Sequence, residues 1–394
     1  MASLTCPYCF ERYPASSIAY RCINPEPARC APAPDEALGR YQRLLSPPVL
    51  PRVFASPPGM FGRVGKAKCA CGMATTKTVC PECHNDLPTQ FAEMQSRTIA
   101  IIGAKEVGKS HYIAVLIHEL ETRIGMSFNA SLATADETTR TRYLNEFRRF
   151  LYVDRVTIPP TASARAGSSV RLPLVYRLSF ARDGLFANQV RVIMLVFFDT
   201  AGEDLKNIDL MSTETRYIAN SDGLIFLLDP LQIPAVRQQV DPGVPLPVED
   251  APPQHIIERV AQLVRESNRL RPADRLKAPV ALAFSKMDAV LPLMDPGAPV
   301  RHASNHDGYF DIGGAQSTHA SMRSYLHEWI GAGLDQFMRH NFDNYSYFGV
   351  SALGAPPDAQ GHLPLGVAPF RVEDPFLWIL HELGIVPGRK GGSR

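Results

Sequence analysis

Four residues at a characteristic spacing can hold a phosphate group: Gly103, Gly108, Lys109 and Ser110. The two glycines let the backbone curl, so that successive N–H groups face one point. An apolar run at 99–102 is typical of a buried strand, and the apolar segment after Ser110 is typical of a helix. The helix N-terminus adds a partial positive charge. The segment therefore predicts a strand, a phosphate-binding loop and a helix.

Two side chains of this loop have distinct chemistry. The Lys109 ammonium can reach the β- and γ-phosphates of a nucleoside triphosphate, and the Ser110 hydroxyl can bind Mg²⁺. We expect Lys109 to act in catalysis as well as in binding. The loop residues expected to contact the nucleotide are Gly103, Ala104, Lys105, Glu106, Val107, Gly108, Lys109, Ser110 and His111.

A second loop, DTAGE, directly follows the apolar run VIMLVFF. Asp199 ends that predicted strand, where its carboxylate can hold Mg²⁺ through water. Gly202 can offer its N–H to a γ-phosphate, and Glu203 comes next. We therefore place Asp199 at the metal, and Gly202 and Glu203 among the catalytic residues.

Two further loops can recognise a base. In SKMD, the Asp288 carboxylate can accept two hydrogen bonds from the N1 and N2 edge of guanine, a donor pair that adenine lacks. The Lys286 stem can lie along the purine face, next to Ser285. In the segment SAL, a backbone N–H of Ser351, Ala352 or Leu353 can meet the guanine O6. Together these loops predict guanine as the base.

Strand and helix patterns alternate through the larger part of the chain, which favours a mostly parallel sheet with helices on both faces. Active residues should then lie at the carboxyl ends of the strands. The predicted strands are 98–103, 170–180, 191–200, 223–229, 279–286 and 345–353. The predicted helices are 111–120, 137–152, 255–270, 319–342 and 372–384, and a long loop is expected from 288 to about 317.

All eight cysteines lie in the proline-rich N-terminal quarter, where CxxC pairs indicate zinc. Eight thiolates suit two four-sulfur sites, and two arrangements stay open. One is sequential: Cys6, Cys9, Cys22 and Cys30, then Cys69, Cys71, Cys80 and Cys83. In the other, Cys6 and Cys9 join Cys80 and Cys83, and the middle four form the second site. We predict a zinc-binding, ribbon-like domain at 1–95 and a P-loop domain at 96–394.

The composition is that of an ordinary globular protein, with 45% hydrophobic and 20% charged residues. A net charge of +2 gives no reason to expect a nucleic-acid or membrane partner. No apolar run approaches the roughly 20 residues that span a bilayer. The N-terminus MASLTCPYCF lacks the basic and apolar regions of a secretory signal. We therefore expect a cytoplasmic protein.

The segments GAKEVGKS, DTAGE, SKMD and SAL resemble, in this order, the four recurrent loops of Ras-like P-loop GTPases. The resemblance covers residues 98–385. It implies GTP or GDP with Mg²⁺, bound through Lys109, Ser110 and Asp199. Gly202 would sense the γ-phosphate, and Asp288 with Lys286 would bind the base.

The family also requires a threonine in its first switch loop. Thr161 is our choice for this metal-binding and catalytic residue, with Thr157 second. Glu203 departs from the family, because many members have a glutamine there that orients the attacking water. Lys105 stands where glycine is frequent and would crowd an arginine finger entering in trans. We therefore expect slow hydrolysis.

The zinc-type pairs and the segment TCPYCFERYPASSIAYRC also resemble the second member of bacterial double-GTPase families. Those proteins are encoded beside another GTPase in conflict or defence systems. The resemblance implies a switching role and a protein partner, with a second GTPase as one candidate. Two other functions remain open, an ATP-using P-loop enzyme and a non-catalytic nucleotide-binding scaffold. The guanine-type SKMD loop opposes the first.

Overall fold

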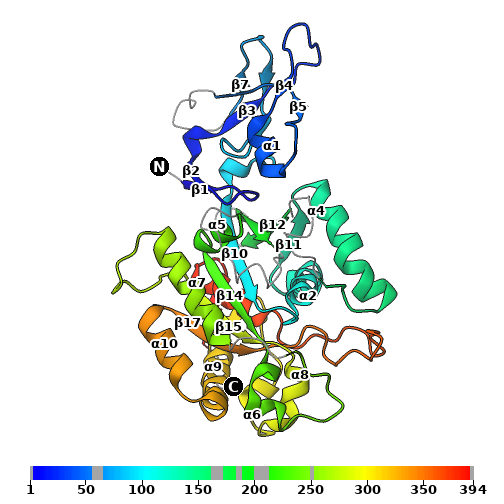
Figure 1. The fold of residues 1–394 in the computed structure, drawn as a ribbon, viewed down its shortest axis with the longest axis vertical. Coiled ribbons are helices and arrows are strands. Elements are labelled where there is room, and N and C mark those ends of the chain that lie inside the picture. Colours follow the sequence, from blue (N-terminus) through cyan, green and yellow to red (C-terminus); the bar gives the residue numbers. More distant parts are fainter. Residues whose placement is uncertain are drawn as a thin grey trace.

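A seven-stranded sheet in the order β11-β12-β13-β10-β14-β15-β17 forms the centre of the computed structural model (Figure 1). The structure describes residues 3–55, 65–160, 172–182, 189–198, 213–248 and 253–390. The strands are β10 (Gln95–Gly103), β11 (Ala130–Thr134), β12 (Leu174–Arg182), β13 (Gln189–Phe197), β14 (Gly223–Leu228), β15 (Val280–Phe284) and β17 (Tyr345–Gly349). Strands β13, β10, β14, β15 and β17 pair in parallel, whereas β12 is antiparallel to both of its neighbours.

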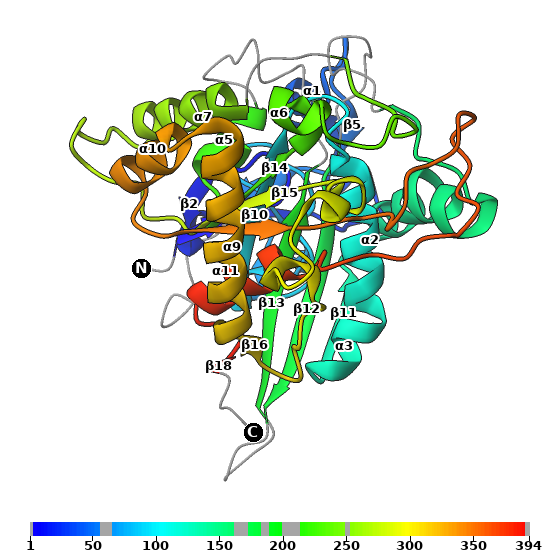
Figure 2. The same ribbon diagram turned by 90° about the horizontal axis from the view of Figure 1, so that it is seen from below.

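Helices cover both faces of the sheet because its strands are apolar on both sides (Figure 2). In β10, Ile99 and Ile101 belong to one core and Ala100 and Ile102 to the other. Helices on the first face are α2 (Lys109–Glu121), α3 (Arg123–Ser127) and α11 (Asp374–Glu382). Those on the second are α5 (Thr213–Ala219), α7 (Pro253–Ser267), α9 (Ile312–Ile330) and α10 (Gly333–Asn341). The predicted fold class is confirmed.

Some predicted boundaries are wrong. The single helix expected at 319–342 is two helices, because Gly331 takes a φ of 76° and ends α9. Helix α9 also begins inside the expected loop, at Ile312, where the Asp311 side chain accepts a hydrogen bond from the Gly314 N–H at 3.0 Å. The same loop holds the short helix α8 (Met287–Val290).

Two further elements differ from the prediction. Strand β11 has no predicted counterpart, because its residues alternate between half-buried and exposed and form no buried run. The expected helix 137–152 is an α-helix, α4 (Glu137–Arg142), continued by a π-helical segment over Tyr143–Asp154. No helix among the described residues is long and apolar enough to cross a bilayer.

The described part of the cysteine-rich region consists of short strands, the α-helix α1 and short 3-10 turns, and it lies beside α5 and the start of β10 (Figure 1). Its core is continuous with the second core of the sheet. Buried Arg21 forms an ion pair with Asp35 at 3.2 Å, and His84 Nδ1 lies 2.7 Å from the same carboxylate. The elements are β1 (Ser3–Thr5), β2 (Arg12–Pro14), β3 (Ala19–Arg21), β4 (Ala33–Pro34), α1 (Glu36–Gln42), β5 (Val49–Leu50), β6 (Val53–Ala55), β7 (Ala67–Lys68), β8 (Ala74–Thr75) and β9 (Thr78–Val79).

Candidate functional site

The loop between β10 and α2 has the backbone that the sequence predicts. Gly103 ends β10 in contact with the neighbouring strand, and Gly108 takes a φ of 92° immediately before α2. A Cβ at Gly103 would lie 2.7 Å from the Leu227 carbonyl oxygen and 2.7 Å from a Val107 methyl group. Both glycines are therefore required, one for close approach and one for its left-handed conformation.

Lys109 lies within the curl of this loop and is only 7% exposed. Its ammonium donates to the carbonyl oxygens of Gly103 at 2.9 Å and Ala104 at 3.1 Å. Burying a charged group requires such partners. The contacts hold a positive charge beside the first turn of α2, where the half-buried Ser110 also lies.

The SKMD and SAL loops meet at the ends of β15 and β17. Ser351 donates its hydroxyl hydrogen bond to Asp288 Oδ1 at 2.5 Å, and its backbone pairs with Phe370 in both directions. This fixes the Asp288 carboxylate through a side chain that is itself only 1% exposed. Lys286 takes a φ of 53°, and its Nζ lies 2.6 Å from the Asp229 carboxylate.

Asp229 is a site residue that the sequence patterns did not single out. It is 5% exposed and directly follows β14, and its other carboxylate oxygen accepts from the Leu231 N–H at 2.9 Å. An available signal was its position after the buried run GLIFLL, the same signal that singled out Asp199. The ion pair sets the direction of the Lys286 side chain.

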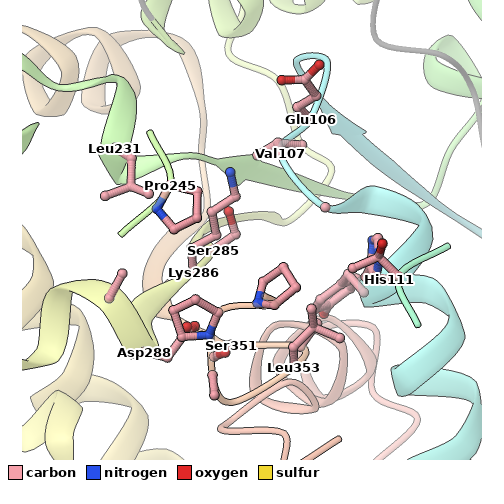
Figure 3. A pocket seen from close by; sticks show the side chains of 18 of the residues that line it. Glu106, Val107, His111, Leu231, Pro245, Ser285, Lys286, Asp288, Ser351 and Leu353 are labelled. Atoms are coloured by element: carbon pink, nitrogen blue, oxygen red, sulfur yellow. Dashed lines mark hydrogen bonds between the residues drawn. The ribbon is translucent and has the colours of Figure 1, made fainter. Parts of the chain in front are cut away.

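A cavity of about 230 Å³ joins three of the four predicted loops (Figure 3). Apolar residues line much of it, with Leu231 and Pro245 from the segment after β14 and Leu353 from the SAL loop. Asp288, Ser351 and Lys286 supply its polar side. The predicted nucleotide-binding residues that line it are Glu106, Val107, Gly108, His111, Ser285, Lys286, Asp288, Ser351, Ala352 and Leu353.

The remaining predicted residues divide into two groups. Gly103, Ala104, Lys105, Lys109 and Ser110 belong to the loop and first helical turn beside the cavity. Thr161, Asp199, Gly202 and Glu203 lie outside the described residues. Thr157, the second choice for the switch threonine, lines the cavity.

His111 connects α2 to the segment that carries Thr157. Its Nε2 accepts a hydrogen bond from the Ile158 N–H at 3.1 Å. Burial, together with the nearby Lys286 charge, lowers the pKa of His111 to about 4. The ring is therefore neutral at pH 7, as its acceptor role requires.

The eight cysteines form two clusters, and the second of the two arrangements is the one in the structure. The clusters are Cys6, Cys9, Cys80 and Cys83, and Cys22, Cys30, Cys69 and Cys71. A tetrahedral zinc with Zn–S bonds of about 2.3 Å places its sulfurs about 3.8 Å apart. The pairs Cys6–Cys83 and Cys9–Cys80 are both 3.8 Å apart, and Cys22–Cys71 and Cys30–Cys69 are 3.7 and 3.9 Å apart.

Backbone and side-chain donors support the same interpretation. The N–H groups of Tyr8, Asn24 and Glu82 each point at a cysteine sulfur two residues earlier, at 3.4 Å. Such donors stabilise thiolates that bind a metal. Both clusters therefore fit zinc in spacing and chemistry.

Zinc content should distinguish the two arrangements. We expect two zinc ions per wild-type chain after dialysis, measured by elemental analysis. The double variant Cys6→Ser/Cys80→Ser should retain one zinc ion, because both cysteines belong to one cluster. Cys6→Ser/Cys22→Ser should retain none. The sequential arrangement requires the reverse result for these two variants.

Gly103→Ala should lower the stability of the fold, because the added methyl group meets backbone at 2.7 Å. We expect a loss of about 2 kcal/mol, seen as a lower thermal midpoint by circular dichroism. Gly333→Ala is the matched control, since its Cβ would meet nothing within 4 Å at the start of α10. Equal midpoints for the two variants would contradict the close packing at Gly103.

No protein-family model matches the chain. The "Putative ESX-1 scaffolding and assembly protein SaeC" of Mycolicibacterium smegmatis is 30% identical over 327 residues, which cover 78% of this chain and 80% of that protein.

Three solved structures are similar at lower levels. The Arl6 BBS3 small GTPase from Trypanosoma brucei with bound GppNp has a TM-score of 0.29 at 12% identity, over 74% of this chain and 98% of that one. The bacterial selenocysteine-specific elongation factor EF-Sec has a TM-score of 0.26 at 12% identity, over 73% of this chain and 29% of that one. The signal recognition particle receptor SRb-GTP/SRX complex from Chaetomium thermophilum has a TM-score of 0.28 at 13% identity, over 67% of this chain and 94% of that one. At these values the likeness assigns no role to any residue of this chain.

Proposed function

This chain belongs to the family of the "Putative ESX-1 scaffolding and assembly protein SaeC", and we propose that it is a GTP-binding switch that recruits a protein partner. The observation that carries the proposal is the single cavity shared by the phosphate loop, the SKMD loop and the SAL loop. These segments are up to about 250 residues apart in sequence, yet their residues line one cavity beside Lys109.

The two ends of the site have complementary chemistry. At the phosphate end, Lys109 and the N–H groups that begin α2 provide positive charge. At the base end, Asp288 would offer acceptors to the two guanine donors, and Lys286, which pairs with Asp229, would lie beside the base. Adenine has no donor pair for Asp288, so this end favours GTP over ATP.

Ser110, Asp199 and one threonine, Thr161 or Thr157, would hold Mg²⁺. The ion would neutralise charge that develops on the phosphates during hydrolysis. Gly202 would donate its N–H to the γ-phosphate. Glu203 would stand next to the attacking water, where a carboxylate repels the phosphates, and we therefore propose slow hydrolysis in the cytoplasm.

The cysteine-rich region at 1–95 would bind zinc and contribute to partner binding. A relative named as a scaffolding and assembly protein favours a protein partner. A second GTPase, as in the double-GTPase systems, is the candidate that the sequence resemblance provides, and a role in bacterial conflict goes with it.

A non-catalytic nucleotide-binding scaffold is the second candidate, and the name of the relative is the observation that favours it. The two functions differ in turnover alone. Tight GTP binding with no release of phosphate over many hours would support the scaffold, whereas slow Mg²⁺-dependent release would support the switch.

The decisive experiment identifies the nucleotide in the purified full chain. Denatured protein should release GDP or GTP on ion-exchange chromatography, and calorimetry on nucleotide-free protein should show GTP binding that excess ATP does not displace. Zinc should be measured on the same sample. Equal affinity for ATP and GTP would overturn the guanine assignment.

A further inference from the structure

The P-loop strand β10 and its neighbour β13 separate before they end. They pair in parallel from Gln95 to Thr98, with Thr98 opposite Val196. Strand β13 continues to Phe197 and β10 continues to Gly103, but the two strands no longer pair after Thr98 and Val196. Residues 99–103 of β10 pair instead with β14, on its other side. The backbone groups of Ile99 and Ile101 that face β13 therefore need another partner.

The hydroxyl group of Tyr217 is that partner. It donates to the Ile99 carbonyl oxygen at 2.8 Å and accepts from the Ile101 N–H at 3.2 Å. It also lies 3.4 Å from the backbone nitrogen of Phe198, which donates to it. A phenol hydroxyl can donate one hydrogen bond and accept others, so it can bridge all three backbone groups. In an uninterrupted parallel ladder, the peptide groups of Phe198 would bond Ile99 and Ile101 directly.

Tyr217 comes from α5, and its ring is held by the cysteine-rich region. The Phe10 ring lies 4.9 Å from the Tyr217 ring and 5.5 Å from the Phe198 ring, between centroids. All three rings are at most 2% exposed. Phe10 directly follows Cys9, and its N–H donates to the Cys6 carbonyl oxygen at 3.1 Å, within the turn that carries these two sulfurs.

Polar contacts fix the same junction. The Asn220 side chain donates to the Phe10 carbonyl oxygen at 2.9 Å, and Arg216 forms an ion pair with Glu11 at 3.0 Å. Arg12 in turn donates to the Asn220 carbonyl oxygen at 2.9 Å. The three residues that follow the first cysteine pair thus attach to the last turn of α5 and to the residue after it.

We propose that Tyr217 is a positioning residue of the nucleotide site, and that the cluster Cys6–Cys9–Cys80–Cys83 acts on that site through Phe10 and Tyr217. The nucleotide part of this inference rests on the proposed function. Strand β10 leads into the phosphate loop and β13 into Asp199, so the hydroxyl sets the separation between the two strands that precede the phosphate-binding groups. Without the hydroxyl, the Ile99 carbonyl oxygen and the Ile101 and Phe198 N–H groups lose their shared partner, and the ends of β10 and β13 are no longer held at this separation.

Zinc in the first cluster should favour nucleotide binding, as the Tyr217 hydroxyl does. Metal in the first cluster holds the turn that places Phe10, and Phe10 in turn packs against the ring of Tyr217. Because coupling between two binding sites is reciprocal, zinc should strengthen nucleotide binding and nucleotide should slow zinc loss.

The test uses the full zinc-loaded chain and the variant Tyr217→Phe, which keeps the ring and removes the hydroxyl. We expect affinity for a fluorescent GTP analogue to fall about fivefold or more, within the range of coupling between sites. Amide hydrogen exchange in peptides containing Ile101 and Phe198 should become faster. Tyr176→Phe is the matched control, because that hydroxyl is buried with no hydrogen-bond partner in the described part of the chain. It should change neither measurement.

Chelation of zinc provides the second arm. In the wild type, chelation should weaken binding of the analogue and accelerate exchange in the same two peptides. In Tyr217→Phe, chelation should change the affinity and the exchange rates little further. Wild-type affinity and wild-type exchange in Tyr217→Phe would overturn the proposal. A wild-type chain that binds no GTP would overturn the proposed function instead, while hydrogen exchange with and without zinc would still decide whether Tyr217 connects the cluster to the sheet.

Discussion

Replacing Lys109 with alanine should weaken GTP binding by about a hundredfold or more. The lysine ammonium is nearly buried, and two carbonyl oxygens of the loop hold it where phosphates would lie. Each hydrogen bond from a charged group contributes roughly 1.5–3 kcal/mol, so the loss of two such bonds to phosphate gives an effect of this size. Lys109 is the first residue of α2, and alanine is the best helix former, so the variant should keep its fold.

Isothermal titration calorimetry with Mg²⁺ and GTP measures this effect, and circular dichroism checks that the variant is folded. Lys277→Ala is the control, since Lys277 is an exposed lysine in the segment before β15, outside the cavity. It should bind GTP as the wild type does. Equal affinities for Lys109→Ala and Lys277→Ala would rule out the phosphate role of the loop.

The parts of the fold that could be predicted are those with local signals. The runs that became β14 and β15 are buried at every position, are short, and are each followed directly by a polar residue, so they favour strands. The phosphate loop depends on two glycines, one required for close approach and the other for its left-handed conformation. The edge strand β11 has no such signal, because its partner β12 lies about 45 residues away in sequence and none of its five residues is buried.

The sequence names candidate site residues one by one, but it does not give the contacts between them. Sequence placed Asp288 and Ser351 in separate loops, and the structure adds that one hydrogen bond joins them. The cysteine pairing stayed open because it depends on how the chain closes over more than 70 residues. Tyr217 carries no sequence signal at all, since its role arises where two strands that are neighbours in space diverge.

Exchanging Asp288 for asparagine should change the base preference from guanine to xanthine. Asparagine presents one acceptor and one donor where aspartate presents two acceptors, so it cannot accept both hydrogen bonds from the guanine N1 and N2 positions. Xanthine has a carbonyl oxygen in place of the N2 amino group, and this oxygen can accept from the asparagine amide. We expect GTP affinity to fall about a hundredfold, because a buried donor is left without its acceptor and a charged acceptor is lost.

Competition between XTP, GTP and ATP for a fluorescent analogue separates this effect from general damage. Ser351 also donates to Asp288 Oδ1, and it can donate equally to the asparagine oxygen, so the SAL loop should keep its place. Asp307→Asn, on an exposed loop, is the control and should keep the wild-type order of affinities. Loss of GTP binding alone would fit disruption of the loop, whereas a gain in XTP binding requires that position 288 contact the base. Unchanged preference for GTP would place the base elsewhere in the cavity and would refute the role of the SKMD loop.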